Sequence, residues 1–260
     1  MQHFSSNGVD IAYVDIGSGP PILLIHGYAS NHAVNWQATS WFATLTEAGR
    51  RIVAMDVRGH GESGKVYDSA QFKPAIMAED AANLLDHLGI PVADVMGYSM
   101  GGRIAARLAI AHPGKVNALV IGGMGYALVA GIGGEEEIVA AMNAPSLDSV
   151  TSDVGRGYRK FAEQTQSDRP ALAACIVGQR EPIAPDDVRR IHAPTLVAVG
   201  ETDKVAGSAE KLGALIPDSE VLIIPRRDHM LATGDRVFKA GVLDFLARHP
   251  LHAAPARETH

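Results

Sequence analysis

The segment Gly97-Tyr98-Ser99-Met100-Gly101 has the residue types and the spacing that nucleophilic chemistry requires. An apolar run precedes it and an amphipathic stretch follows, so we expect it to join a strand to a helix. In such a sharp turn the serine hydroxyl projects, and a Cβ atom on either glycine would collide with the neighbouring strand and helix. The free N–H groups at the start of the helix would face the same point. This context predicts that Ser99 is a nucleophile rather than an incidental residue of a glycine-rich turn.

A serine hydroxyl needs a base to activate it, and the base needs an acid to orient it. When a serine is presented between a strand and a helix, the acid and then the histidine follow it along the chain. Asp203 comes shortly after the apolar run 195–199, and His229 lies in the loop after the apolar run 221–224. The sequence therefore predicts Asp203 as the acid and His229, among eleven histidines, as the base.

Two other carboxylates compete with Asp203 for the role of the acid. Glu201 comes directly after its strand, which leaves little chain to swing it toward the base. Asp228 is the sequence neighbour of His229, an awkward position from which to orient that ring. For Asp203 itself the alternative is a loop-capping aspartate without a catalytic role.

The reaction of a serine nucleophile also needs N–H donors for the oxyanion of its tetrahedral intermediate. We expect one from Met100, which follows the nucleophile, and the other from Tyr28, in the loop after the apolar run 21–25. We expect the ring of His26 to hold this loop by hydrogen bonding rather than to act as the base. Cys175 lacks a turn or a base motif around it, so it is expected to be a small, partly buried apolar residue.

Short apolar runs alternate with amphipathic stretches along most of the chain, which predicts a mostly parallel sheet flanked by helices. The predicted strands are the runs 9–14, 21–25, 51–56, 92–96, 116–121, 195–199 and 221–224. Residues 1–124 and 192–247 are therefore expected to form an α/β core. Residues 248–260 are expected to be a flexible tail.

Residues 125–191 interrupt this alternation and predict a helical cap inserted between two strands of the core. The run Glu135-Glu136-Glu137 is expected to form a solvated first turn that complements a helix dipole. The apolar residues expected to line a pocket or to hold the cap together are Tyr126, Leu128, Val129, Met142, Phe161, Leu172 and Ile176. If the cap does not line the pocket, the loop from Tyr28 to Trp36 should select the substrate.

The composition narrows the class of protein. The chain has 260 residues, of which 47% are hydrophobic and 20% charged, as expected for a compact soluble protein. A net charge of −6 gives no attraction to nucleic acid or to an anionic membrane. No apolar run approaches the roughly 20 residues of a membrane span, and no secretory signal is visible, so we expect a cytoplasmic protein. We further expect a small-molecule substrate, a monomer or small homo-oligomer, and neither a metal nor an organic cofactor.

Four segments resemble the α/β-hydrolase fold family, in particular its small cap-bearing esterases, enol-lactonases and perhydrolase-like members. They are residues 26–28, 56–63, 97–102, and 200–203 with 228–230, and they occur in the family's order. The resemblance implies that 56–63 is a structural turn, so Arg58 and His60 are not expected to be catalytic. Family members that dehalogenate or open epoxides have aspartate as the nucleophile, so Ser99 argues against both activities.

These residues predict a serine hydrolase that cleaves a small carboxylic ester or lactone through an acyl-enzyme. One alternative keeps the triad but cleaves a carbon–carbon bond in a ring-fission diketone. That substrate carries a carboxylate, so its pocket needs a cation near His229, for which Arg180, Arg226 and Arg227 are available. The other alternative is a ligand receptor with only vestigial hydrolase activity.

Overall fold

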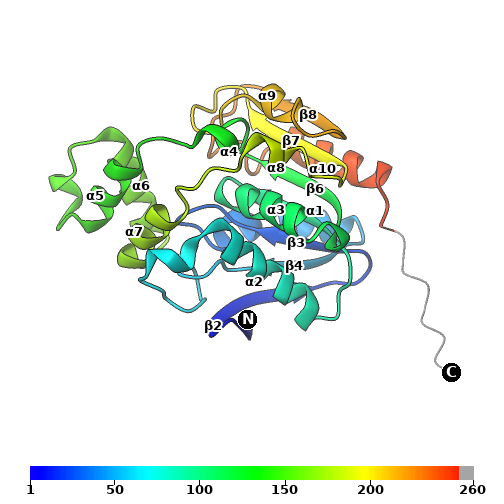
Figure 1. The fold of residues 1–260 in the computed structure, drawn as a ribbon, viewed down its shortest axis with the longest axis horizontal. Helices are drawn as coiled ribbons and strands as arrows, with labels where there is room; N and C mark the ends of the chain where they lie inside the picture. Colours follow the sequence, from blue (N-terminus) through cyan, green and yellow to red (C-terminus); the bar gives the residue numbers. More distant parts are fainter. Residues whose placement is uncertain (252–260) are drawn as a thin grey trace.

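Apolar runs of the chain form most strands of one eight-stranded sheet in the computed structural model, which describes residues 1–251 (Figure 1). The order across the sheet is β1-β2-β4-β3-β5-β6-β7-β8. Strands β3 to β8 are parallel, and β2 is antiparallel to both β1 and β4. The strands are β1 (Gln2–Ser6), β2 (Val9–Ile16), β3 (Pro21–Ile25), β4 (Arg51–Met55), β5 (Ala93–Tyr98), β6 (Val116–Gly122), β7 (Thr195–Gly200) and β8 (Ser219–Ile224).

Helices cover both faces of this sheet, so the predicted α/β class is confirmed. In β3 the side chains of Ile22 and Leu24 enter one apolar cluster, and those of Leu23 and Ile25 enter another. This alternation is expected for a strand buried on both faces. The first cluster is closed by α1 and α10, and the second by α2 and α3. The helices are α1 (Trp41–Glu47), α2 (Pro74–His87), α3 (Met100–Ala111), α4 (Ala127–Ala130), α5 (Glu135–Asn143), α6 (Asp153–Gln164), α7 (Arg169–Gly178), α8 (Pro185–Val188), α9 (Ala209–Gly213) and α10 (Arg236–Arg248).

Helices α4 to α8 all lie between β6 and β7 along the chain, where the sequence predicted a helical insertion. In Figure 1, α5, α6 and α7 form a group at one side of the molecule, away from the sheet. Helix α5 begins at Glu135 and carries all three glutamates in its first turn, as expected. That the insertion behaves as a separate cap domain stays a prediction.

Three local features differ from the sequence-based expectations. Strand β1 was not expected, because only Phe4 and Ser6 of its five residues are buried and no apolar run marks it. Helix α1 was not expected either, because it is seven residues long and buries only Trp41 and Leu45. Arg248, placed in the predicted tail, is the last residue of α10 and forms an ion pair with Glu220. The rest of the predicted tail, from residue 252 on, lies outside the described residues.

The helices that the structure describes include none long and apolar enough to cross a membrane.

Candidate active site

The turn between β5 and α3 holds Ser99 in a strained backbone conformation. Its φ is +55° and its ψ is −115°, a region that residues with a side chain rarely occupy. A Cβ on Gly97 would clash with the backbone of α3 at Gly101, and a Cβ on Gly101 would clash with the carbonyl of Ile25 at the end of β3. The expectation that glycine is required on both sides of the serine is therefore confirmed.

Ser99, His229 and Asp203 form one continuous chain of hydrogen bonds. The Nε2 atom of His229 lies 2.9 Å from Ser99 Oγ, and its Nδ1 atom lies 2.8 Å from Asp203 Oδ2. The Asp203 side chain is fully buried and that of His229 is 16% exposed. The three residues follow β5, β7 and β8, parallel strands whose carboxyl ends meet at one edge of the sheet. The arrangement is that of a nucleophile, a base and an orienting acid.

Asp203 both caps its loop and contacts the base. Its Oδ1 atom accepts hydrogen bonds from the amides of Val205, at 2.8 Å, and Ala206, at 3.0 Å, while Oδ2 faces His229. Asp203 therefore caps its loop and is also placed to orient His229.

The two competing carboxylates have other partners. Glu201 Oε2 accepts from the amide of Arg226 at 2.7 Å. Asp228 Oδ1 accepts from the amides of Met230 and Leu231, at 3.1 and 2.8 Å, and so shapes the turn that carries His229. Neither forms a hydrogen bond with His229 in the described part of the chain.

Tyr28 and Met100, whose amides are the predicted oxyanion donors, line one cavity together with Ser99. The loop after β3 approaches the nucleophile closely, since a Cβ on Gly27 would lie 3.5 Å from Ser99 Cβ. Neither amide donates a hydrogen bond within residues 1–251. Both are therefore free to bind the oxyanion of a tetrahedral intermediate.

His26 holds the peptide that carries the Tyr28 amide, as expected from the sequence. Its Nε2 atom accepts from the amide of Val57 at 2.9 Å, so its Nδ1–H donates to the carbonyl of Gly27 at 2.7 Å. In a planar trans peptide this carbonyl and the Tyr28 N–H point in opposite directions. Burial lowers the pKa of His26, which keeps the ring neutral and this donor in place. His26 therefore orients the predicted oxyanion donor, and both of its ring nitrogens are occupied, so it is not placed to act as the base.

Asn35 was not found from the sequence, yet it holds the same loop. Its Oδ1 atom accepts from the amide of Gly27 at 2.9 Å, and its own backbone lies in a π-helical turn, Ala33–Gln37. Such turns are frequent at functional sites. No sequence motif marks this asparagine, because the contact depends on how the loop after β3 folds back on itself.

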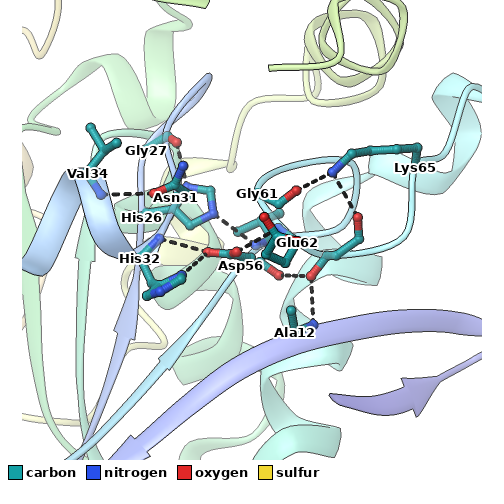
Figure 2. A network of polar contacts seen from close by, with 12 residues as sticks. Ala12, His26, Gly27, Asn31, His32, Val34, Asp56, Gly61, Glu62 and Lys65 are labelled. Carbon is teal, nitrogen blue, oxygen red and sulfur yellow. Dashed lines mark hydrogen bonds and ion pairs between the residues drawn. The ribbon is translucent and has the colours of Figure 1, made fainter. Parts of the chain in front are cut away.

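A buried network around Asp56 stabilises the loops after β3 and β4 (Figure 2). Asp56 accepts hydrogen bonds from the amide and the ring of His32, at 2.7 and 2.8 Å, and from the amide of Glu62 at 2.9 Å. Burial by itself would raise the pKa of Asp56, but these hydrogen bonds and the nearby His26 lower it to about 2. Lys65 donates to the carbonyl of Gly61, which closes the turn. The segment 56–63 is structural, as the family resemblance implied.

Tyr98, the residue before the nucleophile, also contacts the base. Its hydroxyl donates to the backbone carbonyl of His229 at 2.6 Å, and its ring packs against that of Phe238. It thereby ties the loop after β8 to the end of β5. The sequence analysis missed this role, although Tyr98 stands inside the nucleophile motif.

Two cavities of unequal size meet at Ser99. The larger has a volume of about 550 Å³ and is lined by His229, Tyr98 and much of α6. The smaller has a volume of about 30 Å³ and is lined by Met100, Arg103 and residues of the helical insertion. Four residues line both cavities, namely Tyr28, Ser99, Tyr158 and Val205.

The helical insertion contributes to both cavities, but through few of the residues expected. Of the seven candidates, Phe161 lines the larger cavity and Ile176 the smaller, and the remaining five line neither within the described residues. The alternative loop contributes as well, since Tyr28, Ser30, Val34 and Asn35 line the cavities. Tyr158, which lines both, was not among the candidates.

The structure also locates the arginines that were considered for binding a substrate carboxylate, and the single cysteine. Arg180 lines the small cavity, whereas Arg227 pairs with Asp235, and neither Arg226 nor Arg227 lines either cavity in the described part. Cys175 is fully buried beside Met100, with 3.7 Å between their sulfur atoms, and burial raises the pKa of its thiol. Residues 1–251 include no group of three or more His, Cys, Asp or Glu placed to hold a metal ion.

Comparison with known proteins identifies this fold. The family described as alpha/beta hydrolase fold matches residues 20–126. The chain is 28% identical to a non-heme haloperoxidase of Rhodococcus erythropolis over 261 residues, covering 88% of this chain and 92% of that one. A solved hydrolase from Pseudomonas aeruginosa has a TM-score of 0.79 at 24% identity, covering 94% of this chain and 97% of that one. The enol-lactonase from Burkholderia xenovorans has a TM-score of 0.78 at 21% identity, covering 95% and 100%.

Other solved structures of this shape include esterases and meta-cleavage product hydrolases. The sheet order, the match to residues 20–126 and these neighbours agree with one another. The chain therefore has the α/β-hydrolase fold, and its residues 20–126 resemble that family in sequence.

Proposed function

We propose that this protein is a serine hydrolase that cleaves a small carboxylic ester or lactone through an acyl-enzyme. The observation that carries the proposal is the unbroken hydrogen-bond chain from Asp203 through His229 to Ser99, at the junction of two cavities. Family neighbours whose names describe esterases and an enol-lactonase add support.

In the proposed mechanism, Ser99 Oγ attacks the carbonyl carbon while His229 Nε2 takes the hydroxyl proton. The Met100 and Tyr28 amides bind the oxyanion of the tetrahedral intermediate. His229 then gives its proton to the leaving alcohol, and the acyl-enzyme forms. A water molecule, activated by His229, hydrolyses the acyl-enzyme and releases the acid. Asp203 stabilises the transient imidazolium and holds its ring in place.

The test is the variant Ser99→Ala, which should lose ester hydrolysis by on the order of 10⁴-fold or more. Because the hydroxyl is small and alanine keeps the Cβ atom, the melting temperature should stay close to that of the parent. A fluorophosphonate should label Ser99 stoichiometrically in the parent protein, as located by peptide mass spectrometry. Labelling of another residue, or full activity in the alanine variant, would show that Ser99 is not the nucleophile. Turnover well above one acyl group per minute would also argue against the receptor alternative.

A carbon–carbon bond hydrolase remains the second candidate, because Arg180 lines the small cavity beside Ser99. A substrate carboxylate could reach this cation, and meta-cleavage product hydrolases are among the structural neighbours. The two candidates are separated by assaying a ring-fission diketone and an ester with one enzyme preparation. A kcat/KM for the diketone that exceeds the value for every ester would favour the second candidate.

A further inference from the structure

The base lies on one side of the reaction centre, and this sets how a substrate must lie. His229 lines the larger cavity but not the smaller one. In the proposed mechanism, on which this inference rests, His229 gives its proton to the leaving alcohol. The alcohol must therefore occupy the larger cavity, and the acyl group is left with the smaller one.

The small cavity is lined by a buried cation, Arg103, that forms no ion pair within the described residues. Arg103 follows Ser99 by four residues on α3, so the two share one face of the helix start, and its side chain lies in the wall of this cavity. Arg103 is 4% exposed. Its guanidinium donates to the carbonyls of Glu181, at 3.3 Å, and Ala127, at 3.2 Å, and it forms no ion pair with a carboxylate of residues 1–251.

The other charged groups at this cavity leave its charge positive. Arg180 lines it as a second, exposed cation, and Glu135 lines it as an anion. Burial and the neighbouring Arg107 lower the pKa of Arg103, and Glu135 offsets this only in part. A buried charge without a partner is unfavourable, and a bound carboxylate would remove that cost.

We propose that Arg103 binds a carboxylate at the far end of the acyl group. The preferred substrates are then half-esters of short dicarboxylic acids with a bulky apolar alcohol. The small cavity, about 30 Å³, is much smaller than the other one, which suits a short chain that ends in a carboxylate. The larger cavity, about 550 Å³ and lined by residues such as Val34, Val154 and Phe161, suits an apolar alcohol.

The test compares three esters of one alcohol, 2-naphthylmethanol, whose release is followed by chromatography. They are the hydrogen succinate, the butyrate, and the methyl succinate, which is a neutral analogue of the first. The parent protein should give a kcat/KM for the hydrogen succinate that is on the order of 10- to 100-fold above the values for both neutral esters, because charge-assisted hydrogen bonds are strong and geometrically selective.

Variants of the charged residues should change this ratio in opposite directions. Arg103→Met should abolish the preference for the hydrogen succinate, and Arg103→Lys should keep part of it. Glu135→Gln should raise the preference, because it removes the anion that faces the bound carboxylate. The matched control is Arg107→Gln, one turn further along α3, whose side chain pairs with Asp187 outside the cavity. It should leave the ratio unchanged.

The ratio of kcat/KM for the charged ester to that for the neutral esters distinguishes carboxylate binding by Arg103 from a structural role of this residue. Arg103 also holds the carbonyls of Ala127 and Glu181, so its loss could loosen the insertion, but such damage would lower kcat/KM for charged and neutral esters alike. A parent protein that prefers the neutral esters, or an unchanged ratio in Arg103→Met, would overturn the proposal.

Failure of this inference is distinguishable from failure of the proposed function. If Ser99-dependent hydrolysis of the butyrate occurs without any preference for the hydrogen succinate, only the anion site is wrong. If no ester is hydrolysed, calorimetric titration of monomethyl succinate into Ser99→Ala decides the anion site independently. Binding that disappears in the double variant with Arg103→Met supports the site, and absence of binding to Ser99→Ala overturns it.

Discussion

At the scale of single residues, Asp203 shows how one carboxylate serves two purposes. One of its oxygens is occupied by the amides of Val205 and Ala206, and the other faces Nδ1 of His229. The amide hydrogen bonds hold the carboxylate in a single orientation. A ring nitrogen facing a carboxylate oxygen must carry a proton to form a hydrogen bond, so Asp203 selects the tautomer in which Nε2 can accept a proton from Ser99.

The variant Asp203→Asn is therefore expected to lose kcat by on the order of 10³- to 10⁴-fold. An asparagine would keep its oxygen on the two loop amides and turn its NH₂ group toward His229, which favours the wrong tautomer. Steady-state kinetics on one ester measure the loss. Asp228→Asn is the control, since its oxygen can still accept from Met230 and Leu231, and Glu201→Gln is a second one. If either control is more damaging than Asp203→Asn, the acid has been assigned to the wrong carboxylate.

At the scale of elements, the site depends on loops that follow different strands and are joined by side chains. Tyr98, at the end of β5, donates a hydrogen bond to the carbonyl of His229 after β8. His26 and Asn35 fix two sides of Gly27 after β3. The strands set where each loop begins. These hydrogen bonds then fix the orientation of each loop, as a preorganised site requires.

Tyr98→Phe should lower kcat by about 3- to 10-fold and change KM less, because it frees the loop that carries His229 but keeps the ring that lines the larger cavity. The loss of one buried hydrogen bond should also lower the free energy of unfolding by about 1 kcal/mol. Kinetics and chemical denaturation together measure both effects. Tyr67→Phe, which removes an exposed hydroxyl paired with Asp168, should change neither quantity. A rise in KM with unchanged kcat would mean that Tyr98 acts on substrate binding instead.

The helical insertion supplies a second prediction at this scale. Phe161→Ala enlarges the larger cavity, so it should shift the preference among alcohols of different size, with about 1–3 kcal/mol of discrimination per methylene in an apolar pocket. The kcat/KM values for methyl, butyl and octyl esters of one acid measure this shift. Met142→Ala, which is buried in the insertion without lining a cavity, should lower the melting temperature and leave the ratios unchanged. Unchanged ratios in Phe161→Ala would place the alcohol elsewhere.

At the scale of the whole molecule, buried histidines make stability depend on pH. Burial lowers the pKa of His60 to about 3, and burial also lowers that of His26. Both rings stay neutral in the folded protein, whereas the unfolded chain takes up protons below about pH 6.5. The free energy of unfolding should therefore fall as the pH falls below about 6.5, and for His60 this continues toward pH 3.

Each buried histidine contributes a slope of up to about 1.4 kcal/mol per pH unit in this window. Chemical denaturation at several pH values between about 7 and 4.5 measures the slope. His60→Gln should reduce this slope by up to the contribution of one buried histidine, about 1.4 kcal/mol per pH unit. The control His192→Gln, at an exposed position, should leave the slope as in the parent. Stability that is constant across this range would contradict the neutral, buried state of His60.

Much of the active site was predictable because its determinants are local in sequence. Gly97 and Gly101 indicate a turn that has no room for a Cβ atom, and apolar runs indicate strands that are buried on both faces. The order of Ser99, Asp203 and His229 then follows from the order of the strands they succeed. Strand β1 was not predicted because it lacks such a local pattern: its inward positions, Phe4 and Ser6, do not make an apolar run.

Only the tertiary structure decided which residues surround these three. Tyr98 and His229 are 131 positions apart, and Arg103 contacts Glu181 across 78 positions. Both cavities are likewise lined by short segments from distant parts of the chain. Contacts of this kind leave no periodicity or spacing in the sequence, since they depend on how whole elements pack. The three residues of the proposed triad could therefore be identified from the sequence itself, whereas the lining of the cavities was decided by the packing of the helical insertion against the sheet.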